Sequence, residues 1–148
     1  MAGMPTDLTR YPWDAITAGV EAVKRKYYTI DWPDHRPHVD ANMSPEDVEW
    51  ALRVHFNFEG VLFSYNYDGQ EVELRRPAGL SDEGLQRELH YRGKWDPDKE
   101  VTTGVAHVEY SRYEHKQRHI DSNDLDWEGG KERMADIFDE AEDLMYVE

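Results

Sequence analysis

Histidine and aspartate side chains gather in one proline-containing segment of the chain. Asp34, His35, His38 and Asp40 lie in the run Asp-His-Arg-Pro-His-Val-Asp. Imidazole nitrogens and carboxylate oxygens are ligands of zinc and similar borderline metals. The spacing matches no standard ligand pattern, and the alternative is a polar surface loop whose prolines fix its path. We treat these four residues as a candidate metal site.

Two further segments have spacings that are typical of ligands. His115 and His119 would share one face of a helix, but on a strand they lie roughly 13 Å apart. The alternating pattern before them favours a strand. Asp124 begins a segment that matches the first half of a calcium loop, but Ala135 stands where a bidentate Glu is required. We therefore predict a solvated strand end, and Asp124 or Asp126 as a helix cap.

Catalytic chemistry has no recognisable motif in this sequence. No Ser, His and Asp are linked by a nucleophile elbow, and no glycine-rich phosphate loop is present. The chain has no cysteine, which excludes thiol catalysis, disulfides and Cys-based zinc sites. We predict no cofactor and do not favour an enzyme.

The charge balance limits the partners. Acidic residues number 32 against 17 basic ones, which gives a net charge of −15. Such a chain repels nucleic acid and anionic lipid, so both are disfavoured, and the basic and aromatic residues of 110–118 are better explained by internal charge balance. Lysine is scarce and short carboxylates are frequent. This composition resembles that of haloarchaeal cytoplasmic proteins, which implies a surface adapted to high salt.

The acidity is concentrated at the C-terminal end. Residues 121–148 hold eleven acidic and two basic side chains, so they carry nine of the fifteen net negative charges. We predict that the acidic face of the last helix binds a basic protein partner, through Asp136, Asp139, Glu140 and Asp143. The favoured interpretation is a non-enzymatic interaction or regulatory domain. A small metal-binding protein or enzyme that uses loop 31–40, and an acidic mimic of nucleic acid, are the alternatives.

Length and hydropathy predict one domain. The 148 residues fit a single domain, with 1–10 as a loose tail and 11–148 as the folded part. No run approaches the roughly 20 apolar residues of a membrane span. The first ten residues lack the features of a signal peptide, so we expect a cytoplasmic protein.

Apolar periodicity predicts an α+β fold. We expect a helix over 12–28 and a short helix capped by Ser44. Alternating apolar residues predict a three-stranded antiparallel meander over 52–76, with two-residue turns at 59–60 and 68–69. The side of the meander opposite its apolar residues, which includes Glu73 and Arg75, should be exposed to solvent.

In the second half of the chain, capping residues and apolar periodicity predict a short helix, a strand and a final helix. Ser81 should cap a short helix with Leu85 and Leu89 on one face, although residues 88–92 also fit a strand. A polar loop over 94–100 precedes a strand near 102–113. Apolar residues at helical spacing predict a final helix over 131–146. The antiparallel sheet is thus expected to be packed by N-terminal and C-terminal helices.

Overall fold

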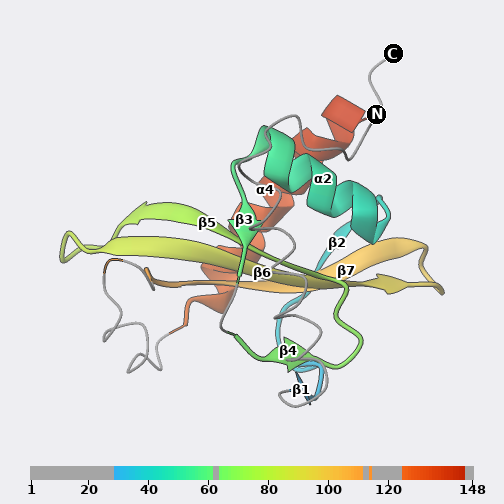
Figure 1. Cartoon of the computed structure of the whole chain (residues 1–148), viewed down its shortest axis with the longest axis horizontal. Helices are drawn as coiled ribbons and strands as arrows, with labels where there is room; N and C mark the ends of the chain where they lie inside the picture. Colours follow the sequence, from blue (N-terminus) through green and yellow to red (C-terminus); the bar gives the residue numbers. More distant parts are fainter. Residues whose placement is uncertain (1–28, 62–63, 112–113, 115–124, 146–148) are drawn as a thin grey trace, which may run out of the picture.

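The computed structural model describes residues 29–61, 64–111, 114 and 125–145. In chain order its elements are β1 (Thr29–Ile30), β2 (Val39–Ala41), α2 (Pro45–His55), β3 (Glu59–Gly60), β4 (Asn66–Tyr67), β5 (Val72–Leu80), β6 (Gln86–Asp96), β7 (Val101–Tyr110) and α4 (Trp127–Met145). Five strands form an antiparallel sheet in the order β2-β7-β6-β5-β3, and β1 and β4 form a separate parallel pair (Figure 1). The predicted α+β class with an antiparallel sheet is confirmed. The tail 1–10 and the helix over 12–28 lie outside the described residues.

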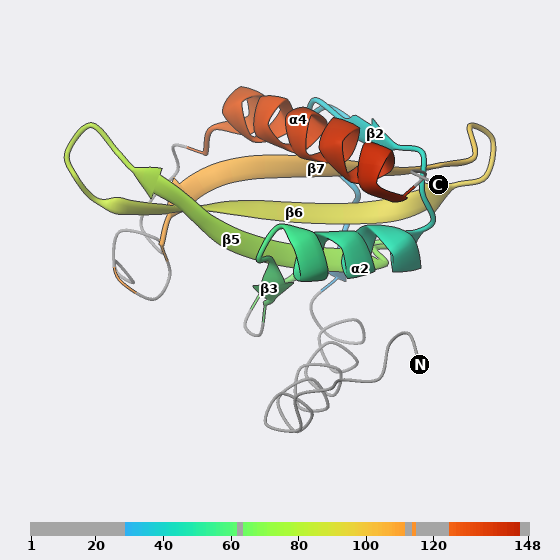
Figure 2. The same ribbon diagram turned by 90° about the horizontal axis from the view of Figure 1, so that it is seen from above.

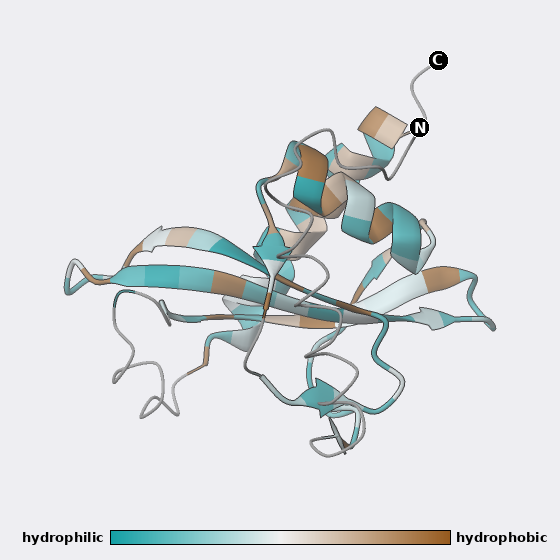
Figure 3. Ribbon diagram, in the orientation of Figure 1, coloured by the Kyte–Doolittle hydropathy of each residue, from teal (hydrophilic) through white to brown (hydrophobic). Residues whose placement is uncertain are grey.

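Helices α2 and α4 pack on the same face of the sheet (Figure 2), with α4 along β7 and α2 over β5. The core therefore lies between this face and the two helices. Its strand residues include Leu74, Leu89, Tyr91, Ala106 and Val108, and its helix residues include Val48, Leu52, Met134 and Phe138. Figure 3 shows hydrophilic and hydrophobic residues following one another along β5 and β6. Because successive side chains of a strand point to opposite faces, the apolar side chains face the two helices and the polar ones lie on the other face of the sheet.

Helix α2 begins where the sequence predicts a cap. The Ser44 hydroxyl accepts a hydrogen bond from the Asp47 N–H at 3.2 Å, and Pro45 occupies the first helical position. The helix buries Val48, Ala51 and Leu52 and continues to His55, so it extends into the segment predicted as the first strand of the meander. Its end lies just before Asn57, whose φ of 59° is incompatible with further helix.

The predicted meander over 52–76 is wrong. Leu52 and Val54 would share one face of a strand, but Leu52 is buried and Val54 is 54% exposed because both belong to α2. Residues 59–60, predicted as a turn, form β3 and pair with β5. Short alternating apolar runs fit both a strand and an amphipathic helix end, and packing of Val48, Ala51 and Leu52 on the sheet decides for the helix.

The turn at Asp68-Gly69 is confirmed, but it does not join paired strands. Gln70 N–H donates to the Tyr67 carbonyl at 3.0 Å, and Gly69 has a φ of 78°. The turn leads from β4, which pairs with β1, into β5, which pairs with β3 and β6. Asp68 and Gly69, which predict a hairpin turn, therefore form the turn at which the chain leaves the β1–β4 pair and enters the five-stranded sheet.

The helix predicted over 81–89 is also wrong, and the strand alternative is confirmed. Strands β5 and β6 form a long hairpin whose tip is a turn: the Ser81 and Leu85 backbones are hydrogen bonded, and Gly84 has a φ of 79°. Strand β5 continues past the end predicted at residue 76, and Pro77 lies inside it beside a register shift. The polar loop expected over 94–100 shortens to a turn after Asp96, whose carboxylate accepts hydrogen bonds from two backbone N–H groups.

Strand β7 and helix α4 agree with the sequence. The Asp126 carboxylate accepts a hydrogen bond from the Gly129 N–H at 2.8 Å, which is the predicted helix-cap role. Gly130 lies against the backbone of β7, where an added Cβ would stand 2.6 Å from the Cα of His107. This close approach fixes the start of α4 on the middle of β7. Among the described helices, none is long and apolar enough to span a bilayer.

Candidate metal centre

The face of the sheet that points away from the helices is lined with charged side chains. We call it the polar face; it consists of Glu73, Arg75, Glu88, His90, Arg92, His107 and Glu109. Each of these residues is less than one-tenth exposed. The sequence predicts a solvated surface for Glu73 and Arg75, and burial corrects that prediction. Because a buried charge without a partner costs several kcal/mol, the pairing of these groups determines whether the fold tolerates them.

Ion pairs join the polar face into two chains. In the first, the Arg75 guanidinium lies between the carboxylates of Glu88 and Glu59. In the second, Arg92 Nε lies 2.8 Å from Glu73 Oε2, and the same oxygen lies 3.1 Å from His90 Nε2. The second chain continues through His90 to Glu109 and His107. Opposite charges therefore alternate along the first chain and between Arg92 and Glu73 in the second, where His90 separates the carboxylates of Glu73 and Glu109. This pairing offsets part of the cost of burial.

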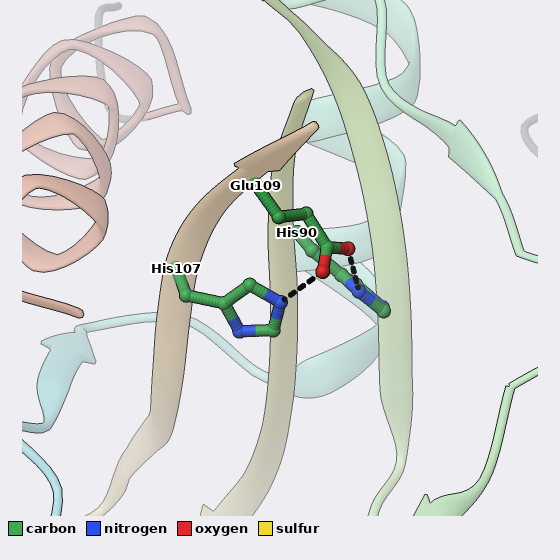
Figure 4. A group of neighbouring side chains, drawn as sticks. All are labelled: His90, His107 and Glu109. Carbon is green, nitrogen blue, oxygen red and sulfur yellow. Dashed lines mark hydrogen bonds and ion pairs between the residues drawn. The ribbon is translucent and has the colours of Figure 1, made fainter. Parts of the chain in front are cut away.

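His90, His107 and Glu109 form a compact group at the end of the second chain. The Glu109 carboxylate lies between the two imidazole rings (Figure 4), with Oε1 3.4 Å from His90 Nδ1 and Oε2 3.2 Å from His107 Nε2. The three ligand-type atoms all lie within 4.8 Å of one another. Sheet register produces this grouping: His107 and Glu109 are two residues apart on β7, and His90 pairs with His107 from β6.

The electrostatics keep the His107 ring neutral near pH 7. Burial lowers the pKa of His107 to about 4, and this effect outweighs the opposing influence of the Glu109 carboxylate. The ring also packs edge-on against Trp127, with 4.7 Å between ring centroids. A neutral imidazole is the form of histidine that binds metals.

Glu109 is ionised in the same environment. Burial by itself would raise the pKa of Glu109, but hydrogen bonds from His107 and His90 prevail and hold the pKa well below its usual range. The group thus offers a carboxylate and a neutral imidazole, with His90 as the third ligand.

The distances fit a small divalent ion after a modest contraction. Two tetrahedral ligands of Zn²⁺ stand about 3.3 Å apart, from metal–ligand distances of about 2.0 Å. Each histidine nitrogen is already close to this length from one Glu109 oxygen, Oε1 for His90 and Oε2 for His107. The ligand atoms of the three residues, one from each, are no more than 4.8 Å apart. Two nitrogens and one oxygen suit Zn²⁺ and other first-row divalent ions. The arrangement can hold such an ion and leave at least one coordination position to another ligand.

The residues proposed from loop 31–40 do not belong to this group. His38 Nε2 accepts a hydrogen bond from the Trp32 indole at 2.7 Å, and its Nδ1 lies 2.7 Å from the Arg36 carbonyl oxygen. Both ring nitrogens are therefore occupied. The other three residues, Asp34, His35 and Asp40, are exposed. Metal binding by this loop stays a prediction.

The acidic residues of α4 predicted to bind a partner are on the surface. Asp136, Asp139, Glu140 and Asp143 are all exposed, at the spacing of one helix face. Their role in binding a basic partner stays a prediction. His115, His119 and Asp124 lie outside the described residues, whereas Asp126 caps α4.

One feature of the sequence indicates part of the metal-binding group. His107 and Glu109 are separated by one residue in a segment predicted as a strand, so they had to share a face. The third member, His90, could be placed beside them only if 86–96 were a strand. The sequence pattern favours a helix from Ser81 to Leu89, which gives no reason to place His90 beside His107 and Glu109.

Comparison with known proteins adds no relative. The chain matches no protein-family model, no curated protein and no solved structure. The functional proposal therefore depends on the geometry of the polar face alone.

Proposed function

We propose that this protein binds a divalent transition-metal ion, with Zn²⁺ as the reference case, through His90, His107 and Glu109. The observation that carries the proposal is the convergence of their three ligand atoms within 4.8 Å on the buried face of the sheet. Burial supports it further, because ligands that are already fixed by packing lose little freedom when the ion binds.

The bound ion would act mainly on stability. It would link β6 to β7 and replace hydrogen bonds of the Glu109 carboxylate by stronger metal bonds. Binding to the native state alone stabilises a protein by about 2.7 kcal/mol when the free ion stands at 100 times its Kd. The three ligands are nearly inaccessible, so access for a large substrate is restricted and a structural or sensing role is favoured over turnover.

The experiment is a zinc titration of the full chain, followed by calorimetry and by thermal unfolding. We expect one equivalent of Zn²⁺ to bind the unaltered protein. His107→Ala and Glu109→Gln should lose this binding. His38→Ala is the matched control, because His38 belongs to the other candidate loop and lies outside the polar face.

The outcomes separate the two metal hypotheses. Unchanged uptake in His38→Ala together with lost uptake in His107→Ala supports the polar face. The reverse pattern assigns the metal to loop 31–40. Absence of binding by the unaltered protein to Zn²⁺, Co²⁺, Ni²⁺ and Fe²⁺ would reject the proposal altogether.

The earlier interpretation, an interaction domain with an acidic surface, is not tested by this geometry. Exposed carboxylates on α4 also serve solubility and, by themselves, favour no particular partner. The metal proposal is preferred because it depends on an arrangement of three buried side chains, which is more specific than a charged surface.

A further inference from the structure

His90 presents its two ring nitrogens to two different carboxylates. Nδ1 lies 3.4 Å from Glu109 Oε1, and Nε2 lies 3.1 Å from Glu73 Oε2. The two nitrogens point to opposite sides of the imidazole ring, so an ion that shares Glu109 can reach only Nδ1. Glu73 therefore stands behind the ring, on the side away from the candidate metal position.

Glu73 is itself held in place. Arg92 Nε lies 2.8 Å from the Glu73 oxygen that faces His90. The Arg92 guanidinium also donates to the Ser64 hydroxyl and stacks on the rings of Tyr65 and Tyr67, with 4.6 and 4.9 Å to the ring centroids. A planar cation fixed on several sides leaves the carboxylate little freedom to turn.

We propose that Glu73, fixed by Arg92, is a positioning residue of the metal centre, and that it makes His90 bind the ion through Nδ1. This inference rests on the proposed function. The physical reason is that Glu73 accepts the hydrogen on Nε2 and keeps it there. When the ion binds, Nδ1 releases the hydrogen that it donates to Glu109 in the metal-free protein and presents its lone pair to the ion. His107 meets Glu109 with Nε2 at 3.2 Å, so the two histidines should bind through different nitrogens.

The first test uses the unaltered, zinc-loaded chain and needs no variant. Long-range ¹H–¹⁵N NMR distinguishes a protonated ring nitrogen from a metal-bound one. We expect His90 to carry hydrogen on Nε2 and metal on Nδ1, and His107 to carry metal on Nε2. Zinc on Nε2 of His90 would overturn the inference while leaving metal binding intact.

The second test measures zinc affinity in Glu73→Gln. Loss of a partner behind a metal-binding histidine weakens affinity by roughly 10- to 100-fold. Glu71→Gln is the matched control: Glu71 is an exposed carboxylate on the same stretch of chain and accepts a hydrogen bond from the Trp95 N–H, remote from His90. We expect the affinity of Glu71→Gln to be unchanged.

The outcomes distinguish this inference from the proposed function. Equal zinc affinity in Glu73→Gln and the unaltered protein would refute the positioning role, although His107→Ala still abolished binding. If the unaltered protein bound no metal, the proposed function would fail first. A Co²⁺ absorption spectrum that changes in Glu73→Gln and not in Glu71→Gln would show that Glu73 acts on the coordination geometry, which a purely structural role would leave unaltered.

Discussion

His107 combines deep burial with a carboxylate and an indole in direct contact, and this combination makes it sensitive to pH. Glu109 lies on the same strand, His90 faces it from β6, and Trp127 covers it from α4. After burial, the electrostatic influence of His90 and of the Arg92 guanidinium also lowers the pKa of His107. A proton on His107 is therefore costly in the folded protein and carries no such cost in the unfolded chain.

The metal-free protein should lose stability between pH 6.5 and pH 4. Burial lowers the pKa of His107 from 6.5 to about 4, so in this range the unfolded chain binds a proton that the folded protein does not. The contribution of His107 to the free energy of unfolding is therefore fully present above pH 6.5. It is lost as the pH falls towards 4, by on the order of 3 kcal/mol in total. Urea unfolding in EDTA at stepped pH values measures this slope.

His107→Gln is the control for the pH prediction. It should flatten the slope between pH 6.5 and pH 5. The lowered pKa of Glu109 does not yet contribute there, because Glu109 of the unfolded chain takes up a proton only near and below its ordinary pKa of 4.5. An unchanged slope in this variant would contradict the assignment to His107. Below pH 4.5 Glu109 acts in the same direction, so the comparison is confined to the upper range.

At the residue scale, the sequence could indicate ligand types but not their partners. His38 lies near other ligand-type residues in the chain, yet its two ring nitrogens contact the Trp32 indole and the Arg36 carbonyl. Glu109 and His107 were correctly placed on one strand. Their third partner, His90, comes from a strand 17 residues away, as the sequence separation of 107 and 90 shows, and only the pairing of β6 with β7 brings it near.

At the scale of elements, the central strands depend on a pair of glycines. Gly93 and Gly104 lie opposite each other on β6 and β7, and the buried Tyr91 ring lies over both. Tyr91 also packs edge-on against Phe138 of α4, with 5.4 Å between ring centroids. The glycines thus provide the space in which an aromatic ring can lie flat along the sheet.

Gly104→Ala should destabilise the protein by about 1–3 kcal/mol, because the core has no room for an added methyl group. Its Cβ would stand 2.6 Å from the Arg92 carbonyl oxygen, which belongs to the backbone and cannot move aside. Tyr91→Phe is the comparison: within the described part of the chain the Tyr91 hydroxyl is buried without a hydrogen-bond partner, so its removal should cost nothing or stabilise slightly. Chemical denaturation measures both. Equal stability of Gly104→Ala and the unaltered protein would contradict the packing argument.

The elements that the sequence predicted correctly are those with local signals. Ser44 and Asp126 cap helices by hydrogen bonds to their own chain, and α4 has apolar residues at helical spacing over its length. The errors lie where short apolar runs fit either a helix or a strand, at 52–55 and 81–92. There tertiary packing decides the structure: Leu52 is buried on the inner face of α2, and Leu89 is buried in β6.

The whole molecule combines a buried network of opposite charges with a surface that is strongly negative. The net charge of −15 includes the exposed acidic side chains of α4. Repulsion among exposed charges weakens the compact state and is screened by salt, whereas ion pairs buried on the polar face are screened much less. Salt should therefore relieve the unfavourable interactions and leave most of the favourable ones intact.

We accordingly expect the Tm to rise when KCl increases from about 0.01 M to about 1 M, because the Debye length falls from about 30 Å to about 3 Å. A variant with Asp136→Asn, Asp139→Asn, Glu140→Gln and Asp143→Asn removes four of the exposed charges without touching the polar face. Its Tm should be higher than that of the unaltered chain in low salt and should depend less on KCl. Thermal unfolding followed by circular dichroism measures both curves. A Tm that stays level or falls with KCl would reject adaptation to high salt, and equal salt dependence in the two proteins would show that the face of α4 is not where the repulsion is concentrated.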